Sequence, residues 1–265
     1  MLFRSVENCA GTQVSFTVAG TSAHTINYQW QVSTNVGATF SNINGANTAS
    51  HVITNVTTGI NNNLYRCILT NTACATASIS NAAKLTVRAL PTITLTAAPI
   101  TTLLPGQTTL LTAATSPSNG GSLSTNWFYN TAPISVTANT YPVSINQAGN
   151  YYATITETYP SGLQCSNTSA TVTITAAESS KLFIFPSPSN GSFTVSYYNS
   201  SYINTKRSIA VYDTKGALVY KKEFTISNTY SIQNVTLVQS STGYYMVVLF
   251  DADGKKIIEG KVLIK

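Results

Sequence analysis

Residues 64–69 read Leu-Tyr-Arg-Cys-Ile-Leu, and residues 27–32 read Asn-Tyr-Gln-Trp-Gln-Val. In both stretches aromatic and aliphatic residues stand among polar ones, which is typical of a strand with one buried face. Segments rich in Asn, Gly and Thr flank them, and such segments form turns. Further runs of this kind occupy residues 13–18, 49–53 and 83–87. Short strands at this spacing predict a β-sandwich for the first part of the chain.

The composition of the chain also favours strands. Of the 265 residues, 43% are hydrophobic, which is ample for buried cores, whereas only 8% are charged against about 25% in an ordinary soluble domain. The polarity comes instead from Thr, Ser and Asn, and these residues favour strands and turns over helices. We therefore predict an all-β chain that is long enough for two or three domains.

Trp30 and Tyr65 are the most specific markers of the first unit. Trp30 lies in the second strand-like run, and Tyr65 stands two residues before Cys67. This pattern resembles the immunoglobulin-like (Ig-like) fold, in which a tryptophan of strand C fills the core and a tyrosine pins the start of strand F. The resemblance implies an Ig-like domain at residues 1–88 with both side chains as core markers.

The cysteines of this unit depart from the common Ig-like pattern. Counting back from Trp30, Val18 stands where strand B usually carries a core cysteine. Cys9 comes earlier in the sequence. Cys67 therefore lacks its usual partner.

Residues 8–18 and 64–74 resemble the Ig-like repeats of large surface proteins from Bacteroidetes-type bacteria. Those repeats often pair an early cysteine with one beyond strand F, which implies a disulfide between Cys9 and Cys74. Connectivity cannot be read from sequence alone. The pairings Cys67–Cys74 and Cys9–Cys67 therefore also stay open.

The second unit, residues 89–177, repeats the first. Asn-Trp-Phe-Tyr at residues 126–129 follows the pattern around the first tryptophan, and Gly-Asn-Tyr-Tyr-Ala at residues 149–153 follows Leu-Tyr-Arg-Cys. The repetition predicts a second Ig-like domain, with Trp127 and Tyr151 as its core markers.

The second unit keeps only one cysteine. Leu104 stands in place of the early cysteine, and Ala153 stands in place of the strand F cysteine. Cys165 has no partner within its own unit, so we expect it to remain a free thiol.

A change in charge marks the start of the third unit. Residues 89–177 carry a single charged side chain, Glu157, whereas residues 179–265 hold ten of the fourteen Lys and Arg against five acids. This break in composition predicts a domain boundary near residue 178. We expect the lysines to blunt exposed sheet edges rather than to bind a phosphate-rich partner.

Residues 181–195 read Lys-Leu-Phe-Ile-Phe-Pro-Ser-Pro-Ser-Asn-Gly-Ser-Phe-Thr-Val. The apolar run can pair as a strand, the two prolines forbid its continuation, and Asn-Gly turns the chain into the next strand. Hairpin signals follow at residues 214–216 and 251–254. Together they predict a third small sandwich at residues 178–265.

Several motifs of the third unit, in this order, resemble the type A C-terminal sorting domain of the type IX secretion system. The family usually has Pro-Asn-Pro where this chain has Pro-Ser-Pro. The residues that carry the resemblance are Pro186, Pro188, Asn190, Gly191, Asp213, Gly216, Gly243, Tyr244 and Lys265.

The resemblance implies a route and a set of partners. The domain would be recognised by the outer-membrane type IX translocon and its sortase-like processing machinery. It would be removed near residues 176–180 as the rest of the protein is attached to anionic lipopolysaccharide on the cell surface.

The sequence predicts no catalytic, cofactor-binding or metal-binding residues. His24 and His51 lie near no Asp or Ser pattern, the four cysteines form no CxxC or Cys/His cluster, and residues 251–254 lack the later ligands of a calcium loop. No Arg-rich run or RNA-binding aromatic signature favours nucleic acid. No signal peptide and no apolar run of about 20 residues is present, so a transmembrane segment is not expected.

These features favour an exported, non-enzymatic surface protein in which two Ig-like stalk or adhesion modules precede a sorting domain. We interpret the chain as the C-terminal portion of a longer precursor. The alternatives are the non-catalytic tail of a large secreted hydrolase and a carbohydrate-binding module. Surface glycans and other cell-surface proteins are the candidate partners, although Trp30 and Trp127 at core positions speak against a sugar-binding platform.

Overall fold

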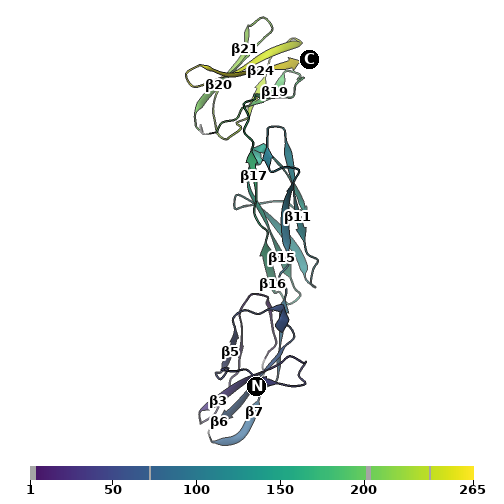
Figure 1. The fold of residues 1–265 in the computed structure, drawn as a ribbon, viewed down its shortest axis with the longest axis vertical. Helices are drawn as coiled ribbons and strands as arrows, with labels where there is room; N and C mark the ends of the chain where they lie inside the picture. The colour runs from purple at the N-terminus through teal and green to yellow at the C-terminus, as the bar shows by residue number, and fades with distance from the viewer. Residues whose placement is uncertain (1–3, 72, 201–203, 239) are drawn as a thin grey trace.

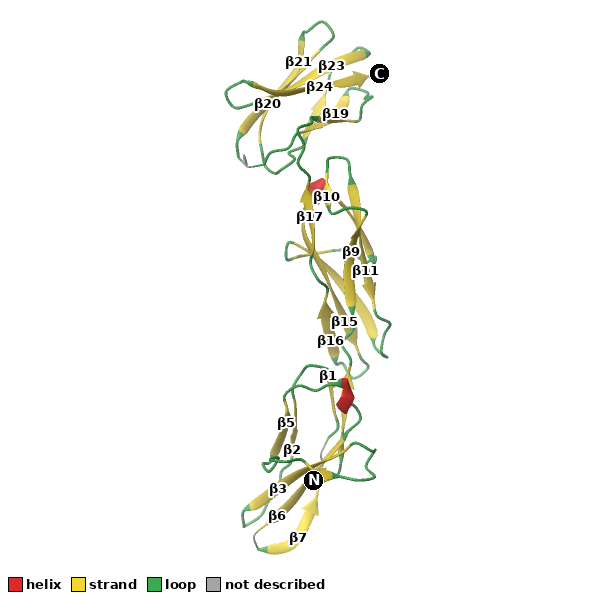
Figure 2. Ribbon diagram, in the orientation of Figure 1, coloured by secondary structure: helices red, strands yellow, loops and turns green. Residues whose placement is uncertain are grey.

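The computed structural model describes residues 4–71, 73–200, 204–238 and 240–265, without the side chains of residues 74–76. The described residues are nearly all in strands and loops, apart from the short 3-10 turns η1 (Thr58–Ile60) and η2 (Ile145–Gln147). The strands gather into bodies that follow one another along the long axis of the molecule (Figures 1 and 2). We name them segment 1 (residues 4–88), segment 2 (residues 89–177) and segment 3 (residues 178–265).

The described strands of segment 1 form a sandwich. One sheet has the order β1-β8-β6-β3-β4, with β7 added beside β6, and the other pairs β2 with β5. β1 runs parallel to β8, whereas the remaining pairs are antiparallel. The strands are β1 (Val6–Cys9), β2 (Val14–Thr17), β3 (Ile26–Ser33), β4 (Ser41–Asn42), β5 (Ser50–Ile53), β6 (Leu64–Asn71), β7 (Cys74–Ile79) and β8 (Ala83–Arg88).

Segment 2 repeats this arrangement. Its larger sheet has the order β10-β17-β15-β12-β13, with β16 beside β15, and its smaller sheet has the order β14-β11-β9. β10 runs parallel to β17, as β1 does to β8. The strands are β9 (Ile93–Ala98), β10 (Thr102–Leu103), β11 (Thr108–Thr115), β12 (Ser122–Tyr129), β13 (Ala132–Ile134), β14 (Thr140–Ser144), β15 (Gly149–Thr158), β16 (Gln164–Thr168) and β17 (Val172–Ala176).

The registers of the two segments explain why the sequence repeats. Trp30 lies opposite Cys67 across β3 and β6, and Trp127 lies opposite Ala153 across β12 and β15. All four side chains are fully buried, because successive residues of a strand alternate between the core and the outer face. The strand order and these core positions make both segments Ig-like.

The described strands of segment 3 form a sandwich of a different order. One sheet runs β18-β19-β22 and the other β21-β20-β23-β24. The two sheets enclose a core in which Ile209, Val211, Val247 and Val262 are fully buried. The strands are β18 (Phe183–Phe185), β19 (Ser192–Ser196), β20 (Lys206–Tyr212), β21 (Leu218–Thr225), β22 (Gln233–Thr236), β23 (Gly243–Phe250) and β24 (Lys256–Ile264).

The all-β prediction is confirmed. Among the described strands, no sheet combines strands from two segments. The division into three domains at residues 88/89 and 177/178 stays a prediction.

Candidate functional site

The proline-rich stretch after β18 lies against the C-terminal strand. Ser189 donates its backbone N–H to the carbonyl oxygen of Leu263 at 2.8 Å, and Lys265 donates its backbone N–H to the carbonyl oxygen of Ser189 at 2.9 Å. Leu263 also donates to the hydroxyl of Ser187 at 3.2 Å. Pro186 and Pro188 are exposed and follow cis peptide bonds. The stretch therefore fixes the end of the chain at Lys265.

A tight turn carries the chain from this stretch into β19. The Ser189 hydroxyl accepts a hydrogen bond from the N–H of Gly191 at 3.1 Å and donates one to the carbonyl oxygen of Ser192 at 2.7 Å. Asn190 is exposed at the tip of the turn. Gly191 has a φ of 99°, which side chains rarely adopt. The Asn-Gly pair thus has a structural reason at this position.

The remaining residues of the predicted sorting motif lie at the same end of segment 3. Asp213 accepts hydrogen bonds from the backbone N–H groups of Lys215 and Ala217, both at 2.8 Å, and Gly216 completes that turn with a φ of 81°. The turn reaches Gly243, where an added Cβ would lie 3.3 Å from a side-chain carbon of Thr214.

Gly243 and Tyr244 in turn pair with Ile264 and Leu263 of the C-terminal strand. The motif residues are separated in sequence, and the sheet brings them together. Tyr244 is 61% exposed there.

Tyr245 is the residue of this end that sequence reasoning missed. Its side chain is 3% exposed, and its hydroxyl accepts from the N–H of Ser241 and donates to the carbonyl oxygen of Ser241, both at 3.0 Å. This contact pins the loop before β23 to the core. In the pair Tyr244-Tyr245, the alternation of the strand decides which ring points inward. The sequence does not show this alternation clearly, because Val247 and Val248 are adjacent apolar residues.

The four core markers of the Ig-like segments are all buried. Trp30 and Trp127 are 0% exposed, and Tyr65 and Tyr151 are 4% and 1% exposed. The Tyr151 hydroxyl donates to the carbonyl oxygen of Gln147 at 2.6 Å, four residues upstream, as in a tyrosine corner. Neither indole is available to stack on a ligand.

The predicted Cys9–Cys74 disulfide is wrong, because Cys9 bonds to Cys165. The Cα atoms of the two residues are 5.6 Å apart, within the usual range for a disulfide. The prediction that Cys165 is a free thiol fails with it. Cys67 is a free, fully buried thiol, and burial raises its pKa. The side chain of Cys74 lies outside the described residues.

The physical reason for this pairing is the direction of β1. This strand runs parallel to β8, so Cys9 lies opposite Arg88, the last residue of segment 1. Cys9 thereby faces the neighbouring segment, where Cys165 begins β16 together with Gln164. The predicted pairing was wrong because it was taken from repeats in which both cysteines lie in the same domain.

Polar contacts surround this disulfide and form the rest of the first junction. Arg88 makes an ion pair with Glu7 at 2.6 Å, and its guanidinium lies 4.4 Å from the ring centroid of Tyr159. A hydrogen bond with Ser161 of segment 2 lowers the pKa of Glu7 against the opposing effect of burial, and Arg88 lowers it further. Tyr159, Cys9 and Cys165 are buried together.

Glu157 lies next to Tyr159 and fixes the loop at residues 118–121. One of its carboxylate oxygens accepts hydrogen bonds from the Ser118 hydroxyl at 2.9 Å, the Asn119 N–H at 2.6 Å and the Gly121 N–H at 3.0 Å. The side chain is 0% exposed. Burial favours a raised pKa, yet these hydrogen bonds outweigh it and lower the pKa of Glu157 below its ordinary value.

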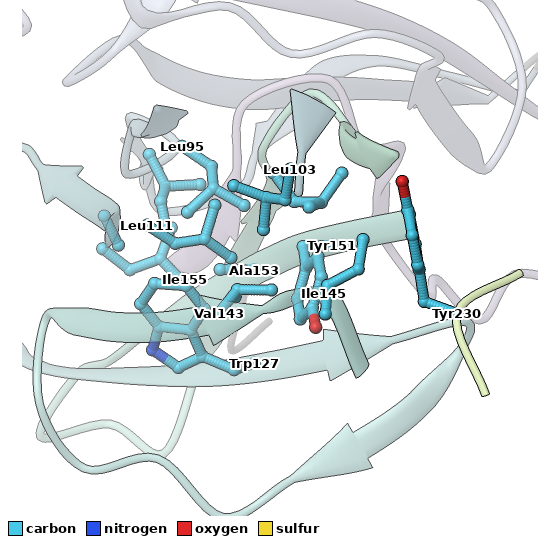
Figure 3. Close-up of a cluster of buried hydrophobic side chains, with 13 residues drawn as sticks. Leu95, Leu103, Leu111, Trp127, Val143, Ile145, Tyr151, Ala153, Ile155 and Tyr230 are labelled. Carbon is cyan, nitrogen blue, oxygen red and sulfur yellow. The ribbon is translucent and has the colours of Figure 1, made fainter. Parts of the chain in front are cut away.

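The second junction, between segments 2 and 3, centres on Tyr230. Its side chain is 2% exposed and belongs to the hydrophobic cluster of segment 2, at whose edge Figure 3 shows it. The hydroxyl donates to the carbonyl oxygen of Ala177 at 2.7 Å. Phe183 and Tyr198 pack against the ring at centroid distances of 5.8 and 5.5 Å. Burial raises the pKa of Tyr230 to about 12, so the hydroxyl keeps its proton.

Two family models match the chain. Residues 183–265 match the secretion system C-terminal sorting domain, and residues 4–89 match a family described as a domain of unknown function. The first match confirms the predicted type IX sorting tail. No curated protein matches the chain.

Many solved structures match the chain at low identity. A marsupial T cell receptor is 14% identical, with 97% of this chain and 98% of that chain covered and a TM-score of 0.42. Murine CEACAM1b is 16% identical, with 66% and 98% covered and a TM-score of 0.33. The N-terminal eight Ig domains of Down Syndrome Cell Adhesion Molecule are 9% identical, with a TM-score of 0.31; the match covers 99% of this chain and 35% of that one.

The sorting tail implies the location of the protein. A type IX sorting domain directs export to the cell surface and implies interaction with the type IX secretion machinery. Within the part of the chain that the structure describes, no helix is long and apolar enough to span a membrane. The sorting tail makes this a secreted or surface protein, and the segments before the tail have an Ig-like fold.

Proposed function

We propose that segments 1 and 2 form a single non-enzymatic stalk unit, which segment 3 delivers to the cell surface. The observation that carries this proposal is the Cys9–Cys165 disulfide. It joins two Ig-like segments that a short linker, residues 89–92, already connects. A covalent bond in addition to the linker restricts the relative rotation of the two segments. A unit that holds its length in this way can separate an attached domain from the membrane.

The ionisable side chains of the first two segments support a non-enzymatic role. The acidic residues before segment 3 are Glu7 and Glu157, and both serve structural contacts, Glu7 at the first junction and Glu157 within segment 2. His51 packs between Trp30 and Tyr65, at centroid distances of 5.9 Å from each, and burial lowers its pKa. These groups are engaged in holding the fold, whereas a general base needs a free path to a substrate.

The partners of segment 3 in this proposal are the outer-membrane translocon and a sortase-like processing enzyme. The exposed end that gathers Pro186, Asn190, Tyr244 and Lys265 is the surface that we assign to recognition. These residues come from three separate stretches of the sequence. Their gathering at one end gives a folded feature that a receptor could recognise.

In the experiment, a signal peptide and then an epitope are fused in front of residue 4, and the fusion is expressed in a host with a type IX system. We expect the epitope on the surface of intact cells, and energy transfer from an epitope-bound dye to a membrane dye should increase when residues 4–92 are deleted. Periplasmic retention of the tagged chain, while a known sorting domain is exported in parallel, would contradict the delivery role. Unchanged energy transfer after the deletion would contradict the stalk role.

A further inference from the structure

The segment between β17 and β18, residues 177–182, is held more firmly than an ordinary linker. Ala177 donates its N–H to the carbonyl oxygen of Leu103 at 2.8 Å, which extends the register of β10 and β17. Ala177, Ser179 and Leu182 are partly buried. Linkers between domains are usually exposed and make few contacts. Something other than chain connectivity therefore fixes this segment.

Tyr230 and Tyr198 of segment 3 supply that fixation. The Tyr230 hydroxyl donates a hydrogen bond to the carbonyl oxygen of Ala177 at 2.7 Å. The Tyr198 hydroxyl donates one to the carboxylate of Glu178 at 3.1 Å. The two tyrosines are bridged through their backbones, and their rings pack at a centroid distance of 5.5 Å. They act as one pair of clamping side chains across the linker.

The clamp rests on the end of segment 2. Tyr230 buries its ring in the cluster that contains Ile145 and Tyr151. Beside this contact lies a cleft of about 400 Å³, lined by residues of both segments that include Tyr129, Ile174 and Thr229. Phe183 and Tyr198 pack against the same cluster, and the cleft leaves the interface incompletely filled beside these rings. Such an interface can open without unfolding either segment.

We propose that docked segment 3 protects residues 177–181 from proteolysis, and that a protease reaches this segment only after Tyr230 leaves the end of segment 2. A protease must draw several residues of extended chain into its cleft before water adds across the C–N bond of one peptide unit. Clamped residues cannot make that movement, so cleavage follows the population of the undocked state. Processing in this region belongs to the proposed delivery role, on which the biological meaning of the clamp rests.

The chain carries its own reporter for this test. Lys181 is an exposed trypsin site directly after the clamped residues, and Lys255 is an exposed trypsin site in the hairpin between β23 and β24. Cleavage after Lys181 reports undocking, whereas cleavage after Lys255 reports unfolding of segment 3. The full chain is treated briefly with trypsin, and the fragments are identified by mass spectrometry.

We expect Tyr230→Ala to speed cleavage after Lys181 by roughly tenfold relative to cleavage after Lys255, which corresponds to a loss of about 1.4 kcal/mol of docking free energy. Tyr230→Phe keeps the ring and loses the hydrogen bonds of the hydroxyl to Ala177 and Ser179, so a smaller increase is expected. Leu218→Ala removes an exposed side chain of the same segment and should leave both cleavage rates unchanged.

Two results would overturn the proposal. One is cleavage after Lys181 at the wild-type rate in both Tyr230 variants. The other is wild-type cleavage after Lys181 that is already as fast as in unfolded chain. If Tyr230→Ala unfolds segment 3, cleavage after Lys255 will rise as well, and Tyr230→Phe then decides. The assay needs no secretion machinery, so failed export would contradict the delivery role and leave this inference standing.

Discussion

The two junctions of the molecule connect similar sandwiches by opposite means. Between segments 1 and 2, a disulfide joins Cys9 to Cys165, and Arg88 makes a cation–π contact with Tyr159. Between segments 2 and 3, the contact depends on Tyr230, and segment 3 contains no cysteine. The first junction cannot open in an oxidising compartment, whereas the second can separate reversibly. The molecule therefore combines a permanent pair with a detachable tail.

Among tests of this contrast between the two junctions, removal of the disulfide should have the largest effect on stability. We expect Cys165→Ser to lower the free energy of unfolding of the joined pair by roughly 2–5 kcal/mol, because the bond restricts the unfolded chain. Calorimetry without reductant should show the transitions of segments 1 and 2 moving apart. The matched control is Cys67→Ala, which removes a buried thiol that lies in the core of segment 1.

The control should lower the transition of segment 1 alone and keep the two segments coupled. If Cys165→Ser unfolds like the wild type, the disulfide contributes nothing to the junction, and the contrast drawn between the two junctions is wrong. Segment 3 should keep its own transition in both variants.

Acid should destabilise segment 2 through Glu157 and weaken the first junction through Glu7. The fold lowers the pKa of both carboxyls below their ordinary value of 4.5. Their contribution to stability is therefore fully present above pH 4.5 and is lost as the pH falls through the lower folded value. Melting temperatures measured between pH 7 and pH 3 should fall for segment 2.

Glu157→Gln sharpens this test. At neutral pH the substitution should cost roughly 1–3 kcal/mol, since hydrogen bonds to a charged acceptor become bonds to an amide. The variant should also lose part of the acid sensitivity of segment 2. An unchanged pH profile in Glu157→Gln would show that Glu157 does not supply the dependence.

The sequence predicted the fold of each segment better than the contacts between segments. Trp30 and Trp127 occupy equivalent core positions because local alternation and the repeat both determine which face of a strand is buried. Alternation carries no information about partners in another segment. Cys9 and Cys165 are 156 residues apart, and the available signal was that Cys165 has no second cysteine in its own unit, so a disulfide partner could come only from the first unit.

The sorting motif shows the same limit within segment 3. The order of the motifs identified the segment, and the match at residues 183–265 confirms it. The turn residues Gly191 and Gly216 could be predicted, since Asn-Gly and Lys-Gly are local turn signals. Tyr230 could not be predicted, because its role depends on how one end of segment 2 meets segment 3.

The most direct test of the permanent first junction is peptide mapping of the unreduced protein. Free thiols are blocked with an alkylating reagent under denaturing conditions, and the chain is digested with trypsin. The sequence places Cys9 on the peptide 5–66, Cys67 and Cys74 on 67–84, and Cys165 on 89–181. We predict that peptide 5–66 is linked to peptide 89–181 and that Cys67 is alkylated. A link between 5–66 and 67–84, or an alkylated Cys165, would contradict the account.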